Sequence, residues 1–245
     1  MKRRRPCACS VKSPPTRKRP LNCAKEFSDP QVAARFLKLI AAESSQFDGV
    51  KNLMEVCGTH TMALFRHGIR SLLPEKIHLL SGPGCPVCVT PIDYIDKALA
   101  LARDKNITLA TFGDLARVPG SSSSLLKEKA KGSDLCIVYS PADAVSLAAR
   151  HPERRVVFLA VGFETTAPTV GASILEAARL GLKNFFVLCA HKTIPEAMRL
   201  LAEDQELRID GFLCPAHVSA IIGAEAYRPL AEERKIPCVI TGFEP

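Results

Sequence analysis

The chain has 245 residues, of which 47% are hydrophobic and 24% charged, and its formal net charge at pH 7 is +8. This balance is that of an ordinary globular protein and excludes a disulfide miniprotein or a disordered polymer. Trp is absent and aromatic residues make up only 6%, so stacked-base recognition and an aromatic membrane belt are not indicated. We therefore expect no nucleic-acid partner and no membrane partner.

The positive charge lies in the first 25 residues, which hold nine Lys and Arg and no acid, while residues 26–245 hold 24 basic and 25 acidic residues. The segment 1–25 lacks the apolar stretch of a secretory signal, and its four prolines would break the helix of a transit peptide. We expect a disordered basic arm over 1–25 and a cytoplasmic protein. Ten cysteines in that compartment are expected to stay reduced, which favours metal ligation or thiol chemistry.

Helical and β-branched segments alternate along the rest of the chain. The first is a helix over 29–43, with Asp29 as N-cap and Pro30 at the first helical position. The β-branched runs predict strands near 52–56, 77–80, 107–111, 134–138, 155–161, 184–189, 210–213 and 237–240. Helices are predicted between them near 60–72, 91–103, 122–130, 141–150, 167–180, 193–203 and 225–234. This order is typical of an α/β fold with parallel sheets.

The segment RVPGSSSS (117–124) has the composition of a turn or linker. We therefore expect two similar lobes, 26–118 and 119–245, each a parallel sheet with helices on both faces. In open α/β sheets, ligands bind beyond the carboxyl ends of the strands. Motifs that directly follow a predicted strand are therefore the candidates for chemistry.

The first such motif is CGTHT (57–61). Gly58 permits a tight turn, Thr59 is a candidate cap, and Cys57 then lies near the positive end of a helix, where a thiolate is stabilised. Cys57 is thus a candidate metal ligand or nucleophile. The alternative is that Cys57 is a small core residue and His60 a surface residue of the helix.

The second motif is SGPGCPVCVTP (81–91), which places Cys85 and Cys88 in a Gly- and Pro-rich loop before a helix. Two exposed sulfurs at such a place are typical of dithiol redox motifs. Half of a zinc site is the alternative, but no second C-x-x-C or clean His pair completes four ligands.

Three weaker motifs also follow strands. GFETTAP (162–168) offers Glu164 for ligand binding or proton transfer, or else a helix-capping turn. CAHK (189–192) and CPAHVS (214–219) each place a Cys and a His at a strand end, where a lone His is more often structural. The chain has no G-x-G-x-x-G and no Walker A loop, so nucleotide dependence is not indicated.

Taken together, the motifs resemble those of the HypD-type [NiFe] hydrogenase maturation proteins. The motifs that carry the resemblance are MEVCGTHTMALFRHGI, LLSGPGCPVCVTP, TFGDLARVPGSSSSL, VYSPADAV, VVFLAVGFETTAPT, AHVSAIIG and VITGFEP. The resemblance covers residues 30–245, and CGTHT with GPGCPVC is its most specific part.

The resemblance implies a scaffold on which iron receives two cyanides and one carbon monoxide, rather than a turnover enzyme. It also implies a small HypC-type chaperone and a HypE-type cyanide donor as partners. The iron-ligating cysteine falls on Cys57 and the histidine beside it on His60. The redox-active pair falls on Cys85 and Cys88, and the acidic position on Glu164.

Three further polar residues of these motifs, Thr59, Thr61 and His217, are candidates for contacting the bound centre. The family also holds a [4Fe–4S] cluster on cysteines beyond the GFEP motif. This sequence ends at Pro245 within that motif, and its other cysteines do not follow a cluster spacing, so we expect no ligands for the cluster in it. Two alternatives stay open, a thiol–disulfide oxidoreductase that uses Cys85 and Cys88, and an inactive truncated remnant.

Overall fold

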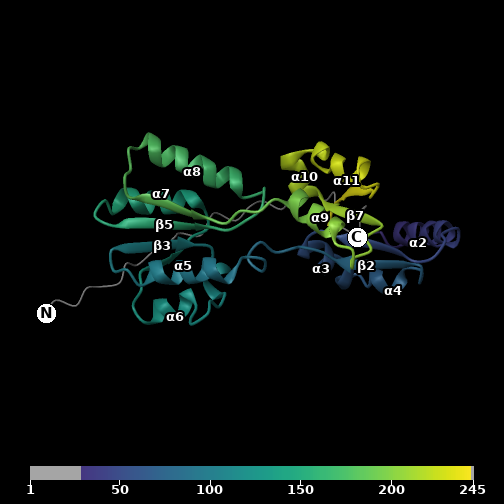
Figure 1. Ribbon diagram of the computed structural model, residues 1–245, viewed down its shortest axis with the longest axis horizontal. Helices are drawn as coiled ribbons and strands as arrows, with labels where there is room; N and C mark the ends of the chain where they lie inside the picture. The colour runs from purple at the N-terminus through teal and green to yellow at the C-terminus, as the bar shows by residue number, and fades with distance from the viewer. Residues whose placement is uncertain (1–28, 244–245) are drawn as a thin grey trace.

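Two four-stranded parallel sheets form the centres of two lobes (Figure 1). The computed structural model describes residues 29–243, so the basic arm expected over 1–25 lies outside the described residues. The strands are β1 (Lys51–Glu55), β2 (Ile77–Ser81), β3 (Ile107–Thr111), β4 (Leu135–Ile137), β5 (Arg155–Ala160), β6 (Phe185–Cys189), β7 (Gly211–Pro215) and β8 (Cys238–Thr241). All eight lie where the β-branched runs predicted them.

The strand order places the two ends of the described chain in the same lobe. The first lobe contains the sheet β2-β1-β7-β8, and the second lobe contains the sheet β4-β3-β5-β6. Every strand pair is parallel, with Leu53 opposite both Leu79 and Gly211 in the first sheet, for example. The α/β class with two similar lobes is thereby confirmed.

The second lobe has helices on both faces of its sheet. One face packs on α5 (Ile92–Ala102), η1 (Leu115–Arg117) and α6 (Leu125–Ala130). The other packs on α7 (Pro141–Arg150) and α8 (Ala167–Arg179). Because both faces are covered, the central strands β3 and β5 are buried along nearly their whole length.

The first lobe has a buried core on one face of its sheet. That face packs on α9 (Ile194–Glu203), α10 (Ala216–Ile222), η2 (Ala224–Tyr227) and α11 (Arg228–Glu232). The helices α2 (Pro30–Ser45), α3 (Gly58–Arg66) and α4 (Ile69–Leu72) lie along the opposite side (Figure 1). No helix within residues 29–243 combines the length and apolar character that a membrane span requires.

Local sequence signals start several of these helices. The Asp29 side chain accepts a hydrogen bond of 2.8 Å from the Gln31 amide and caps α2, as predicted. Ser140 and Asp143 form a reciprocal capping box at α7. The helix α10, which was not among the predicted helices, has only seven residues, too few to show an apolar period.

The division expected at residues 118 and 119 does not coincide with the sheets. The strand β3 belongs with β4, β5 and β6, while β7 and β8 return to pair beside β1. The serine-rich segment is a turn packed on α5, because the Asp96 carboxylate accepts hydrogen bonds from the amide and hydroxyl of Ser121. Ser124 then caps α6. The turn-forming residues of 117–124 therefore lead into a helix within one lobe. They do not form a linker between the two lobes.

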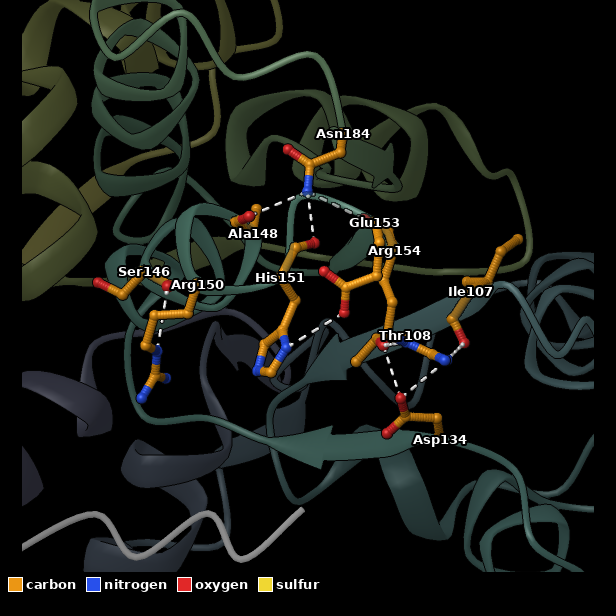
Figure 2. A network of polar contacts seen from close by, with 10 residues as sticks. All are labelled: Ile107, Thr108, Asp134, Ser146, Ala148, Arg150, His151, Glu153, Arg154 and Asn184. Carbon is orange, nitrogen blue, oxygen red and sulfur yellow. Dashed lines mark hydrogen bonds and ion pairs between the residues drawn. The ribbon is translucent and has the colours of Figure 1, made fainter. Parts of the chain in front are cut away.

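A network of polar contacts joins loops at the amino end of the second sheet (Figure 2). The Asn184 amide donates to the carbonyl oxygens of Ala148, His151 and Arg154 at 2.9–3.0 Å. The Arg154 guanidinium in turn donates to the Thr108 hydroxyl at 2.7 Å and pairs with Asp134. One side chain thus adds hydrogen bonds to three carbonyls of the turn that leads from α7 into β5, two of which also accept from backbone amides.

Replacing Asn184 with Ala is expected to lower the free energy of unfolding by about 2 kcal/mol, because three part-buried carbonyls lose their side-chain hydrogen bonds and only those of Ala148 and His151 also accept from a backbone amide. The midpoint of urea denaturation measures the change. Lys183→Ala, at the exposed preceding residue, is the matched control and should stay within about 0.5 kcal/mol of the parent chain. Equal midpoints for the two variants would contradict this role of Asn184.

Candidate functional site

The carboxyl ends of the two sheets meet where the lobes join. The chain crosses from the first lobe to the second through the loop 82–91, which leaves β2 and enters α5, and returns through the loop 190–193, which leaves β6 and enters α9. In each sheet the chain first adds a strand on one side and later adds strands on the other side. This change of side lies between β1 and β7 in the first sheet and between β3 and β5 in the second. Such changes of side are the usual place of ligand sites in α/β sheets.

Phe163 fixes this junction from the second lobe. It is the third residue after the second-lobe strand β5, yet its ring is buried in the core of the first lobe with Met54, Val56 and Phe212. The next residue, Glu164, accepts a hydrogen bond of 2.7 Å from the Ile194 amide at the start of α9. Its second oxygen, Oε2, is buried without a hydrogen-bond partner. The predicted acidic residue therefore lies at the junction and is held on α9.

Cys57 leaves β1 and caps α3 with its own sulfur. The Thr59 amide donates to Cys57 Sγ at 3.4 Å, and the Thr61 amide donates to the Cys57 carbonyl at 3.3 Å. The expectation that Thr59 caps the helix was wrong, because α3 begins at Gly58, two residues earlier than that role requires. The Cys57 side chain is half-buried, not sealed in the core. Its sulfur thus lies at a helix N-terminus and accepts a backbone hydrogen bond there.

The backbone at Cys57 is strained. Its φ is 146°, a value that residues with a side chain rarely adopt, and such a conformation costs about 1–3 kcal/mol. It persists only where surrounding contacts hold it. The segments that pack on this turn must therefore hold Cys57 in its strained conformation.

The loop with the C-x-x-C motif packs directly on the Cys57 turn. A Cβ atom on Gly84 would lie 2.9 Å from Gly58 Cα and 3.0 Å from the Cys57 carbonyl carbon, and closer still to the Gly58 amide nitrogen. These are backbone atoms, which cannot rotate away as a side chain can. Only glycine therefore allows the two motifs to touch at this point.

Cys85 and Cys88 form a close dithiol in that loop. The Cys88 amide donates to Cys85 Sγ at 3.3 Å. A hydrogen bond to Cys85, with burial as a smaller cause, raises the pKa of the Cys88 thiol. Cys88 is exposed, whereas Cys85 is half-buried against the second-lobe core, so the expectation of two exposed sulfurs holds for Cys88 alone.

A ring cluster joins the turns after β1, β7 and β8. Phe243 lies between His60, at 4.7 Å between ring centroids, and His217, at 5.0 Å. Desolvation lowers the pKa of His217, and the nearby His60 adds to the effect. His217 is therefore neutral at pH 7.

His60 is buried, with 5% of its surface exposed. The alternative that His60 is a surface residue of the helix is therefore wrong. Its Nε2 lies 2.9 Å from both the Gly242 carbonyl oxygen and the Thr241 hydroxyl. Its Nδ1 is buried without a partner. Any further bond from this ring must therefore come from Nδ1.

One polar residue beneath the site was missed from the sequence. Glu55, two residues before Cys57, is fully buried. Its Oε1 accepts hydrogen bonds from Arg70 at 2.5 Å and from the Ser81 hydroxyl at 2.9 Å, while its Oε2 has no partner. The bond to Ser81 links the end of β1 to the end of β2, where the two motif loops begin. A single acid within an apolar strand is the signal that could have revealed it.

The structure thus gathers most of the predicted residues at one junction. Cys57, Thr59, Thr61, His60 and His217 share the carboxyl end of the first sheet, and the dithiol loop touches this group through Gly84. Beside it lies a pocket of about 480 Å³ lined by residues that include Thr59, Met62 and Phe243. Among residues 29–243, no group of three or more His, Cys, Asp or Glu side chains is placed to hold a metal ion. Cys57 therefore belongs to no such group within the described residues.

The family model HypD, described as the hydrogenase formation hypA family, matches residues 31–245. The chain belongs to the HypD family. Hydrogenase maturation factor HypD of Rhodobacter capsulatus is 46% identical over 226 residues, which are 91% of this chain and 60% of the relative. The HypD of Azotobacter vinelandii is 48% identical over 90% of this chain and 59% of the relative. That of Escherichia coli is 47% identical over 79% of this chain and 52% of the relative.

The chain thus spans at most about 60% of the length of these relatives. The matched region contains every motif described above, including the Cys57 turn, the dithiol loop and the His60–Phe243–His217 cluster. The geometry of the junction is therefore that of a HypD-family region.

Gly84→Ala is expected to lower the free energy of unfolding by about 2 kcal/mol, because the added methyl group collides with the backbone of the Cys57 turn. Hydrogen exchange of the amides in the segment 57–61 should also quicken. Gly171→Ala is the matched control, because nothing lies within 4 Å of a Cβ placed there and alanine favours the helix α8. Identical behaviour of the two variants would show that Gly84 is not needed for the contact.

Proposed function

We propose that this chain acts in hydrogenase maturation by holding iron through Cys57 while the metal receives cyanide and carbon monoxide. The observation that carries the proposal is the half-buried Cys57 sulfur at the N-terminus of α3, in direct backbone contact with the loop of a dithiol. The relatives named above are hydrogenase maturation factors. The iron centre is a cargo here, assembled and passed on.

The donor set suits this cargo. A thiolate is a soft ligand that fits low-spin iron with strong-field ligands. The Cys57 sulfur is half-buried at the N-terminus of α3 and accepts the Thr59 amide, so its position is fixed for binding iron. If His60 contributes a second bond, Nδ1 supplies it, because Nε2 already contacts Gly242 and Thr241. Otherwise the buried ring orients the Cys57 turn through Phe243.

The remaining iron positions are then filled from outside this region. The three diatomic ligands take some of them, and the thiolate of a small HypC-type chaperone takes another. The pocket beside Thr59 and Phe243, next to the 51% exposed Met62, is the place where we propose that this chaperone docks. A HypE-type protein supplies cyanide.

The dithiol supplies electrons during assembly. Oxidation of Cys85 and Cys88 to a disulfide passes two electrons to the assembling iron centre with its incoming diatomic ligands and releases two protons, and the hydrogen bond between the two thiols keeps the sulfurs near each other for that bond to form. Glu164, with one carboxylate oxygen unpartnered at the same junction, is the proposed site of proton transfer. Thr59, Thr61 and His217 line the surroundings of the cargo.

Cys57→Ala is expected to abolish iron binding with cyanide and carbonyl infrared bands in the protein purified together with its small partner, because the soft ligand is lost. Cys57→Ser distinguishes the loss of the proposed iron ligand from the loss of the helix cap. The serine hydroxyl accepts the Thr59 amide, so the free energy of unfolding is retained, yet its hard oxygen does not hold the iron. Infrared bands that survive in Cys57→Ala would show that this sulfur is not the ligand.

A thiol–disulfide oxidoreductase is the second candidate, favoured by the hydrogen bond from the Cys88 amide to Cys85 Sγ. The two functions differ in their response to Cys88→Ser. If the dithiol serves the iron centre, this variant keeps iron on Cys57 but lacks the cyanide and carbonyl bands. The parent chain then reduces insulin no faster than free dithiothreitol. Rapid insulin reduction without iron, lost in Cys88→Ser, would instead establish the oxidoreductase.

A further inference from the structure

A second group of reactive side chains lies at the carboxyl end of the second sheet. Cys189 is the last residue of β6, His191 follows it in the crossing loop, and Thr166 precedes α8 after β5. Cys189 Sγ lies 3.4 Å from His191 Nδ1, and His191 Nε2 lies 3.0 Å from Thr166 Oγ1. The three side chains form a chain of hydrogen bonds that includes neither Cys57 nor the dithiol.

The hydrogen bonds fix which nitrogen of His191 carries the proton. The Thr166 hydroxyl donates its one proton to the Phe163 carbonyl oxygen at 3.1 Å. Thr166 Oγ1 must therefore accept from His191, so the proton of the neutral ring lies on Nε2. Nδ1 then carries the lone pair, and it faces the thiol of Cys189. A thiol, a bare imidazole nitrogen and an orienting hydroxyl in this order are the parts of an activated nucleophile.

The backbone is shaped to allow this contact. A Cβ atom on Gly162 would overlap Thr166 Oγ1 and lie 3.0 Å from His191 Nε2. The Lys192 amide also donates to the Gly162 carbonyl oxygen at 3.0 Å, which holds the crossing loop against the GFETT turn. Any residue other than glycine at 162 would separate the imidazole from its orienting hydroxyl.

The surroundings keep the base neutral and the sulfur accessible. Cys189 is exposed, whereas desolvation lowers the pKa of His191, so the ring is uncharged at pH 7. The titratable group that faces Cys189 from α5 is Tyr94, whose hydroxyl donates to the Leu188 carbonyl oxygen at 2.8 Å. Burial, and to a lesser extent Cys189, raises the pKa of Tyr94, so the phenol stays protonated. A metal site is not indicated, because within residues 29–243 no third His, Cys, Asp or Glu joins Cys189 and His191.

We propose that Cys189 is a second nucleophilic thiol whose substrates are disulfides, with His191 as its general base and Thr166 as a positioning residue. The thiol gives its proton to His191 Nδ1, and the sulfur attacks one sulfur of the disulfide. A new disulfide to Cys189 forms as the old bond breaks, and the departing thiolate takes the proton back from His191. The substrate is itself the oxidant, so no other co-reactant is needed.

The experiment follows the reaction of each cysteine with glutathione disulfide in the full reduced chain, read by peptide mass spectrometry from about pH 6 to pH 10. In His191→Gln, the rate at Cys189 near pH 7 should fall at least about tenfold, because the general base is gone. The difference should close near pH 10, where a thiol ionises without a base. The exposed Cys88, read in the same samples, is the internal reference and should not change.

Variants of Thr166 separate positioning from a general loss of structure. Thr166→Val removes the oxygen that accepts from His191 and should slow Cys189 near pH 7 with the same pH dependence. Thr166→Ser retains the hydroxyl and should restore the parent rate. An unchanged rate in His191→Gln would overturn the proposal. A loss that is equal at every pH would also overturn it, because this would reflect altered access to the sulfur.

Discussion

The approach of Gly84 to the backbone of Cys57 and Gly58 is the contact on which the junction depends. It lies between loops that leave the neighbouring strands β1 and β2, and it leaves no room for a side chain. Because both partners are backbone, the spacing of the two motifs is set by the sheet and not by adaptable side chains. The same contact supports the unusual φ of Cys57. The strained Cys57 turn and the dithiol loop therefore form one unit, stabilised by the register of the parallel sheet.

The reactive cysteines lie on or beside the two segments that cross between the lobes. The outward crossing carries Cys85 and Cys88, and the return crossing carries His191 beside Cys189. Phe163, buried in the core of the opposite lobe, holds the two carboxyl ends together between these crossings. Sulfur atoms in different electrostatic surroundings thus lie at a single junction. A thiol at a helix N-terminus, a paired dithiol and a thiol facing a neutral imidazole suit different reactions.

Much of this could be predicted from the sequence, because the strands are short apolar runs with strong β propensity and the motifs directly follow them. What could not be predicted are features that depend on partners distant in sequence. The segment 117–124 has linker composition, yet Asp96 holds it as a turn on α5. Cys57 takes the capping role expected of Thr59 because α3 starts at Gly58. The roles of Glu55 and Thr166 depend on Arg70 and His191, which the sequence does not place beside them.

The sequence by itself determined the α/β class, the positions of all eight strands and membership of a family with the CGTHT and GPGCPVC motifs. Periodicity, propensity and short motifs carry this information because they depend on neighbours within a few residues. Only the tertiary structure decided that β7 and β8 pair beside β1, that the two carboxyl ends face each other, and which nitrogen of His191 meets the thiol of Cys189. The order of strands in a sheet and the direction of a hydrogen bond are set by contacts between distant segments, which local sequence patterns do not encode.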